Sequence, residues 1–151
     1  MDKNARRRLI SRTLTLLDGG DTLPTVTVDE FFDGNDDEDS IGVNLPGDKH
    51  IGLNGFRHVL TSIRDRPDVQ DVFLELTEVP DPDEPLDDEI WPTACVAFVV
   101  TSASLEDVKD WVTILHPRDV SEGWNVRAGI KTPIDKGAMK AGMRPVRVWL
   151  L

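Results

Sequence analysis

The sequence of 151 residues predicts an α+β fold built on a four-stranded antiparallel sheet. Two observations carry this prediction. Apolar residues recur at the three- and four-residue spacing of amphipathic helices in three segments, 5–18, 53–65 and 104–115. Apolar runs, or apolar residues alternating with polar ones, are typical of strands in three others, 69–79, 93–101 and 144–151.

The first helix places Leu9 and Ile10 on one face and its arginines on the other, and the glycines at 19 and 20 end it. Residues 24–28 predict a short extended piece. In residues 41–45, Ile41, Val43 and Leu45 alternate with polar or small residues, which predicts a short strand. The helix at 53–65 follows it, and Pro67 ends that helix.

The rest of the chain predicts two adjacent strands, a helix and a last strand. Segment 69–79 alternates and predicts a strand with one buried face, whereas 93–101 is apolar throughout and predicts a central strand. Ser104 and Asp107 have the spacing of a capping box at the start of the next helix. Segment 144–151 alternates again and predicts the last strand.

After the first helix the elements therefore read β-α-β-β-α-β, the order of a ferredoxin-like arrangement in which the first and third strands are central. The strand at 41–45 is the weakest element, so another α+β strand order stays open. We expect residues 1–151 to form a single domain. Its parts are an N-terminal helix (1–20), a core (21–122) and an irregular segment with the last strand (123–151).

The charge is sorted along the chain. Residues 14–125 hold 26 of the 28 acidic side chains and 6 of the 17 basic ones, so both ends are basic while the total is −11. A negative body disfavours nucleic acid, because phosphate backbones require clustered Lys and Arg. It favours a basic protein partner. Solubility alone, or adaptation to high salt, would also explain the acidity. The oligomeric state is left open.

No segment has the roughly 18 consecutive apolar residues that a membrane helix requires, and the arginine-rich start lacks the features of a signal peptide. Cys95 is the single cysteine, so an internal disulfide is excluded, and its apolar run predicts a buried core position. We expect a cytoplasmic protein.

The segment 33–39 is a turn-rich acidic loop. Its oxygen-bearing side chains alternate as in the first half of a calcium loop, and the candidate ligands are Asp33, Asn35, Asp37 and Asp39. The complete loop motif fails twice, because Glu38 stands where a glycine is needed and Asn44 where a bidentate glutamate is needed. We expect a solvated or partner-binding loop rather than a metal site, with Asp36, Asp37 and Asp39 as candidate contacts.

A second acidic cluster alternates with the prolines of residues 80–89, which keep the segment extended. It is either a solvated loop or an acidic finger offered to a basic surface. The candidate partner-binding residues are Asp83, Glu84, Asp87, Asp88 and the neighbouring Trp91, since tryptophan is enriched at interface hot spots.

Motifs of catalysis and of cofactor binding are missing. The sequence has no G-x-S-x-G, no HExxH and no glycine-rich phosphate loop, and its three histidines lack metal-ligand spacing. We therefore expect no cofactor and lean against an enzyme, although a catalytic pair of carboxylates stays open.

Three phrases, EFFDGNDDEDSIG (30–42), TSAS (101–104) and EGW (122–124), resemble those of small acidic uncharacterised bacterial proteins. Proteins of that size and charge are often immunity proteins of toxin systems, which implies a basic toxin as partner. The sequence thus predicts a non-enzymatic interaction protein, with an immunity-type inhibitor as one form. The alternatives are a small-molecule-binding regulatory module and a metal-dependent hydrolase.

Overall fold

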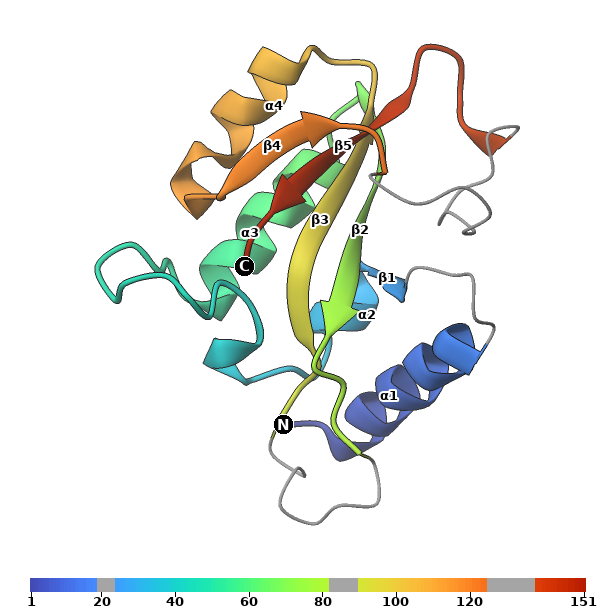
Figure 1. The fold of residues 1–151 in the computed structure, drawn as a ribbon, viewed down its shortest axis with the longest axis vertical. Helices are drawn as coiled ribbons and strands as arrows, with labels where there is room; N and C mark the ends of the chain where they lie inside the picture. The colour runs from blue at the N-terminus through green and yellow to red at the C-terminus, as the bar shows by residue number, and fades with distance from the viewer. Residues whose placement is uncertain (19–23, 82–89, 125–137) are drawn as a thin grey trace.

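A five-stranded antiparallel sheet forms the centre of the protein in a computed structural model that describes residues 1–18, 24–81, 90–124 and 138–151 (Figure 1). Its order is β1-β2-β3-β5-β4. The strands are β1 (Thr25–Thr27), β2 (Val69–Thr77), β3 (Thr93–Thr101), β4 (Asp119–Glu122) and β5 (Arg144–Trp149). The predicted α+β class is confirmed.

The described helices are α1 (Lys3–Asp18), α2 (Val28–Phe32), α3 (Leu53–Arg64) and α4 (Leu105–Val112), with 3-10 turns at Glu38–Ser40 and Thr113–Leu115. The registers Leu74↔Ala97↔Val148 and Val72↔Val99↔Val146 place one face of β2, β3 and β5 in the same core as the apolar residues of α2, α3 and α4. Because these side chains are removed from water, their burial is the main stabilising contribution to the fold. No described helix is both long and apolar enough to cross a membrane.

The strand order is not ferredoxin-like. β3 is central, as expected, but it pairs directly with β5, and the segment that should have separated them forms only the isolated bridge Ile41↔Ala94. The predicted strand at 41–45 is therefore wrong. Gly42 has φ +65° and a Cβ there would lie 2.7 Å from the Phe56 ring, so the chain turns tightly against the core instead of extending.

The second face of the sheet carries a smaller apolar group. Phe73 pairs across the sheet with Phe98, and the Trp124 ring lies 5.0 Å from the Phe98 ring. Glu75 is on the same face, and its partial burial raises its pKa, opposed by the charge of Arg147. Cys95 is partly exposed rather than fully buried, and burial still raises the pKa of its thiol to about 12, so it stays protonated.

Helix α1 differs from its predicted packing. Leu9 and Ile10 are buried, as expected, but so is Arg6, whereas Leu14 and Leu17 are exposed. The Arg6 Nε donates a hydrogen bond to the Ile90 carbonyl oxygen at 2.7 Å, which satisfies a charged group that burial would otherwise destabilise. In Figure 1, α1 lies beside α2 and outside the layer formed by α3 and α4.

Candidate functional site

Helix α2 presents carboxylates to solvent because its other face is fixed in the core. Thr27 and Glu30 form a reciprocal capping box, in which the Glu30 amide donates to Thr27 Oγ1 at 3.2 Å and the Thr27 amide donates to Glu30 Oε1 at 3.1 Å. Phe31 and Phe32 are buried with their rings in a T-shaped contact, 4.9 Å between centroids. Asp29, Glu30 and Asp33 therefore lie on the outside of the helix.

The loop after α2 is ordered by its own polar side chains. Asn35 Oδ1 accepts from the Asp37 amide at 2.9 Å, and Asn35 Nδ2 donates to Ser40 Oγ at 3.0 Å. Asp37 Oδ1 accepts from the Asp39 amide at 3.1 Å and caps the 3-10 turn Glu38–Ser40. The loop ends buried, at Ser40 and Ile41. Side chains of this type satisfy the amides of turns, which explains their number here.

Most carboxylates of the loop 33–39 also bind groups from distant parts of the chain. Asp33 forms an ion pair with Arg57, and Asp36 Oδ2 pairs with the N-terminal ammonium of Met1 at 2.7 Å. Glu38 Oε2 accepts from the Leu53 amide at 2.6 Å. The cap residue of α3, Gly52, has no side chain for that purpose, so Glu38 satisfies one of the free amides at the start of α3.

The candidate contacts of the loop therefore separate into two kinds. Asp37 Oδ2 accepts from the Trp91 amide at 3.0 Å, so both of its oxygens are used in the fold. Asp36 has an exposed ion pair and 64% of its side chain is accessible. The Asp39 carboxylate is exposed and has no hydrogen bond or ion pair with any described residue. Asp36 and Asp39 are the two that remain available to a partner.

The bond between Asp37 and Trp91 joins two segments 54 residues apart in sequence. It places Ile90, at the end of the second acidic cluster, beside the loop 33–39. The candidates Asp83, Glu84, Asp87 and Asp88 lie outside the described residues. Trp91 is fully buried, so its indole offers no surface to a partner, and its Nε1 has no hydrogen-bond partner among the described residues.

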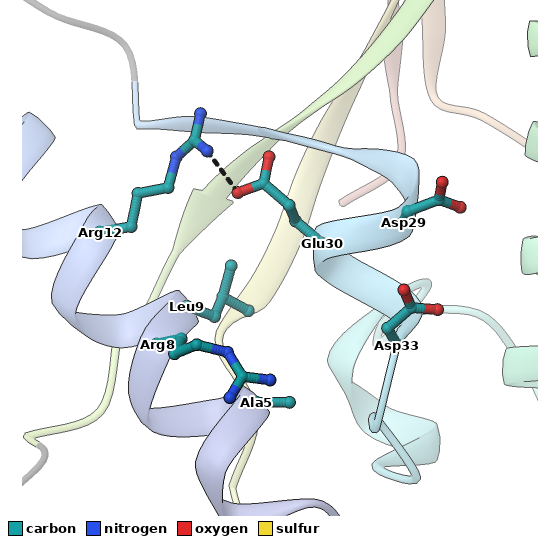
Figure 2. Close-up of a pocket in the computed structure, with 7 residues that line it drawn as sticks. All are labelled: Ala5, Arg8, Leu9, Arg12, Asp29, Glu30 and Asp33. Atoms are coloured by element: carbon teal, nitrogen blue, oxygen red, sulfur yellow. Dashed lines mark ion pairs between the residues drawn. The ribbon is translucent and has the colours of Figure 1, made fainter.

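A charged groove of about 320 Å³ lies between α1 and α2 (Figure 2). Arg8, Arg12, Ala5 and Leu9 of α1 line one wall, and the opposite wall carries Asp29 and Glu30 of α2 and Asp33, which follows it. Arg12 reaches across to Glu30 with a distance of 2.6 Å between Nη1 and Oε2. The Arg8 side chain forms no ion pair with a described residue.

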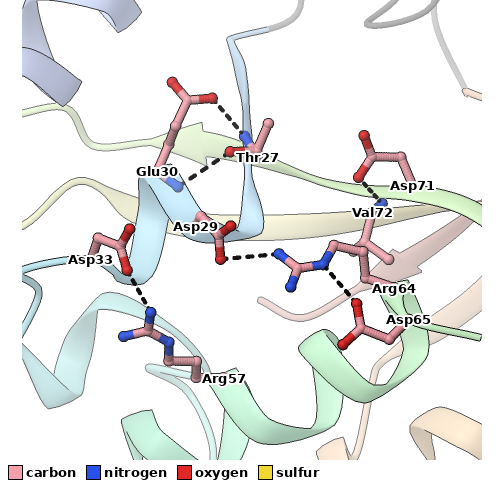
Figure 3. A network of polar contacts seen from close by, with 9 residues as sticks. All are labelled: Thr27, Asp29, Glu30, Asp33, Arg57, Arg64, Asp65, Asp71 and Val72. Carbon is pink, nitrogen blue, oxygen red and sulfur yellow. Dashed lines mark hydrogen bonds and ion pairs between the residues drawn. The ribbon is translucent and has the colours of Figure 1, made fainter.

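A second set of ion pairs fixes α2 to α3 (Figure 3). Arg64 bridges Asp29 at 3.0 Å and Asp65 at 3.3 Å, and its hydrogen bond with Asp29 raises the pKa of the guanidinium. Burial raises the pKa of Asp71, although the carboxylate accepts from the Val72 amide at 2.8 Å. Arg64 thus holds Asp29, as Arg12 holds Glu30, so each carboxylate of α2 has a restricted orientation.

The described residues contain no group of three or more His, Cys, Asp or Glu side chains that could hold a metal ion. The loop oxygens predicted as weak ligands are directed elsewhere: Asp33 to Arg57, and Asn35 and Asp37 to backbone amides or Ser40. The Asp39 carboxylate has no hydrogen bond or ion pair with a described residue. The arrangement is that of a loop stabilised by hydrogen bonds, and it shows no convergence of oxygens on one point.

A separate groove of about 290 Å³ lies beside α3 and α4. Its walls carry His58, Ser62 and Ile63 of α3, and the Arg66 guanidinium lies 4.0 Å over the Trp111 ring. This groove combines an aromatic face with a guanidinium, the group that pairs with carboxylates.

The sequence prediction missed the α2 carboxylates Asp29 and Glu30 and their arginines. One signal was present, since Thr27 and Glu30 have the spacing of a capping box and would have predicted α2. The pairing of Asp29 with Arg64 and of Glu30 with Arg12 could not be found in the same way, because it depends on how α3 and α1 pack against α2.

A model of a family described as uncharacterised protein YfbO matches residues 4–148 of the chain. The chain is 30% identical over 130 residues to an uncharacterised protein YfbO of Escherichia coli (strain K12), covering 83% of this chain and 81% of that protein. No solved structure matches.

Proposed function

The chain belongs to the uncharacterised YfbO family, and we propose that it is a non-enzymatic, cytoplasmic interaction protein whose acidic end binds a basic protein partner. By acidic end we mean the loop 33–39 together with the segment 81–90. Opposed charges on two proteins accelerate their encounter and orient it.

The bond from the Trp91 amide to Asp37 is the observation that supports this proposal most. It brings the base of the second acidic segment to the first, so the two richest stretches of Asp and Glu in the sequence start from one place in the fold. Like charges gathered in one region repel each other, and a basic surface relieves that repulsion.

The internal ion pairs and hydrogen bonds reduce the number of carboxylates of the first loop that can contact a partner. Arg57 neutralises the charge of Asp33, whereas Glu38 and Asp37 accept hydrogen bonds from backbone amides, so the orientation of all three carboxylates is fixed. The binding contribution of the first loop comes from Asp36 and Asp39. The second segment contributes Asp83, Glu84, Asp87 and Asp88.

Co-purification from the native host tests the proposal. The tagged chain is compared with Asp36→Asn/Asp39→Asn at low and high salt, and the recovered proteins are quantified by mass spectrometry. Asp107→Asn/Asp110→Asn is the matched control, because it removes the same charge from exposed residues of α4, at the other end of the molecule in Figure 1.

We expect a basic protein whose recovery falls with salt and with the acidic-end variant and is unchanged in the control. The proposal is contradicted if the recovery changes neither with salt nor in the Asp36→Asn/Asp39→Asn variant. It is also contradicted if the recovery falls equally in the control variant. In one form of the proposal, this chain is an immunity-type inhibitor and the basic partner is a toxin. That form rests on size and charge alone.

A small-molecule-binding regulatory module is the second candidate, favoured by the Arg66 and Trp111 groove. A small aromatic carboxylate that bound there would displace or extend the stack and alter tryptophan fluorescence. A screen of such acids, repeated with Trp111→Leu, tests it: we expect a saturable change that the variant abolishes, and no saturable change in the protein excludes this candidate.

A further inference from the structure

We propose that α1 is an internal competitor at the carboxylates of α2 and the loop 33–39: a basic amphipathic helix that leaves its place when a basic helix of the partner protein takes it. This inference rests on the proposed function and adds how that site is regulated and what shape the partner presents.

The contacts of α1 supply the first argument, because two of them are ion pairs with these carboxylates. The Met1 ammonium pairs with Asp36 at 2.7 Å, and Arg12 pairs with Glu30 at 2.6 Å. Arg6 donates to the Ile90 carbonyl oxygen at 2.7 Å, next to the second acidic segment. The basic N-terminal helix thus already occupies acidic groups in the manner proposed for a partner.

Helix α1 buries little apolar surface for its length of 16 residues. Leu9 and Ile10 are buried, but Leu14 and Leu17 are 37% and 45% exposed, so the second half of the helix presents apolar residues to water. The groove of about 320 Å³ between α1 and α2 shows that the two helices are not closely packed there. Exposed ion pairs contribute little and weaken with salt, so α1 is the described helix best suited to undock.

The start of α1 fits against the loop 33–39 without spare room. The Asp2 amide donates to the Gly34 carbonyl oxygen at 3.0 Å, and a Cβ on Gly34 would lie 2.6 Å from Asp2 Cβ.

Departure of α1 would release Glu30 from Arg12 and Asp36 from Met1, and would leave the α2 wall of the groove open. A partner helix with arginines four residues apart, as Arg8 and Arg12 are, matches that wall.

Hydrogen exchange on the full chain tests whether α1 opens. Arg6→Gln removes the buried tie to Ile90, and Arg7→Gln is the matched control, since Arg7 is its exposed neighbour and makes no hydrogen bond or ion pair with a described residue. We expect amides of residues 3–18 to exchange at least about tenfold faster in Arg6→Gln, as for loss of a charged hydrogen bond, while α3 keeps its rate. Arg12→Gln removes only an exposed ion pair, so we expect a smaller change in the same direction. This variant replaces Arg6→Gln in the experiment if Arg6→Gln does not fold.

A synthetic peptide of residues 1–18, fluorescently labelled, stands in for the partner's helix. We expect it to bind Arg6→Gln more tightly than the unmodified protein, and to bind less tightly as salt is raised. Exchange of α1 at the same rate as α3 under all conditions overturns the proposal. So does an opened α1 whose place the peptide does not take. Neither measurement needs the natural partner, so this inference and the proposed function can fail separately.

Discussion

The acidic residues of this chain perform different tasks that their side chains alone do not reveal. Asp37 and Glu38 accept hydrogen bonds from amides of Trp91 and Leu53, in other parts of the fold. Asp39, the next residue in the sequence, has an exposed carboxylate without a described partner. Removal of one of the first two leaves an amide without its acceptor, whereas removal of the third changes only the surface charge.

Asp37→Ala should therefore lower the free energy of unfolding by about 1–3 kcal/mol, since two backbone amides lose their acceptor. Asp39→Ala should stay within about 0.5 kcal/mol of the unmodified protein. Urea denaturation of both variants measures the difference. Equal effects would mean that Asp37 does not hold the two acidic segments together.

The raised pKa of Glu75 can be tested through the pH dependence of the protein's stability. Burial raises its pKa above the ordinary value of 4.5, so the unfolded chain loses its proton at lower pH than the folded protein does. The stability associated with the protonated group is complete below that ordinary value and is lost as pH rises through the folded pKa. Glu75→Gln should therefore stabilise the protein at pH 7, and the gain should vanish below pH 4.5.

Urea denaturation of the protein and of Glu75→Gln across this range measures the gain. A variant that is less stable at pH 7 would show that the attraction of Arg147 outweighs the cost of burial. That result would contradict the raised pKa.

The burial of single residues was the hardest feature to predict. Arg6 stands between other basic residues, and only the fold shows that it alone of the three consecutive arginines is buried. Trp91 was expected near a contact surface because it follows the acidic segment, yet it lies in the core. Residues that are adjacent in sequence can have the same charge and still differ in how deeply they are buried.

At the scale of elements, periodicity predicted the well-packed parts of the chain. The helix at Leu53–Arg64 and the strands Val69–Thr77 and Thr93–Thr101 lie where their apolar spacing placed them, because each buries one face or both in the core. β4 was missed, since its four residues, Asp-Val-Ser-Glu, are mostly polar and lie at the edge of the sheet. α2 was missed because five residues are too few to show a helical period.

The capping box explains why so short a helix forms at all, and Thr27→Ala tests it. The change removes the acceptor for the Glu30 amide and should lower the free energy of unfolding by about 1 kcal/mol. Thr15→Ala is the control, because the Thr15 hydroxyl is exposed and bonds only to the carbonyl of Ser11 within α1. Thermal or urea unfolding that shows no difference between the two would contradict a role for the cap in stabilising α2.

At the scale of the whole molecule, the sequence determines the class of fold but not the strand order. A hairpin between β2 and β3 follows from two adjacent strand patterns, whereas the direct pairing of β3 with β5 depends on 41–45 not forming a strand. The separation of charge was visible in the sequence. The sequence did not show that the basic N-terminus folds back onto the acidic end through Met1 and Arg6, and onto Glu30 of α2 through Arg12.

The central claim is that the acidic end, and no other acidic surface, meets the partner. Carbodiimide joins a carboxylate directly to a lysine in contact with it, so cross-linking in the native host followed by mass spectrometry identifies which carboxylates do so. The account predicts intermolecular links from Asp36, Asp39 and the segment 81–90. Links concentrated instead on Asp107, Asp110 and Asp119, with none at the acidic end, would contradict it.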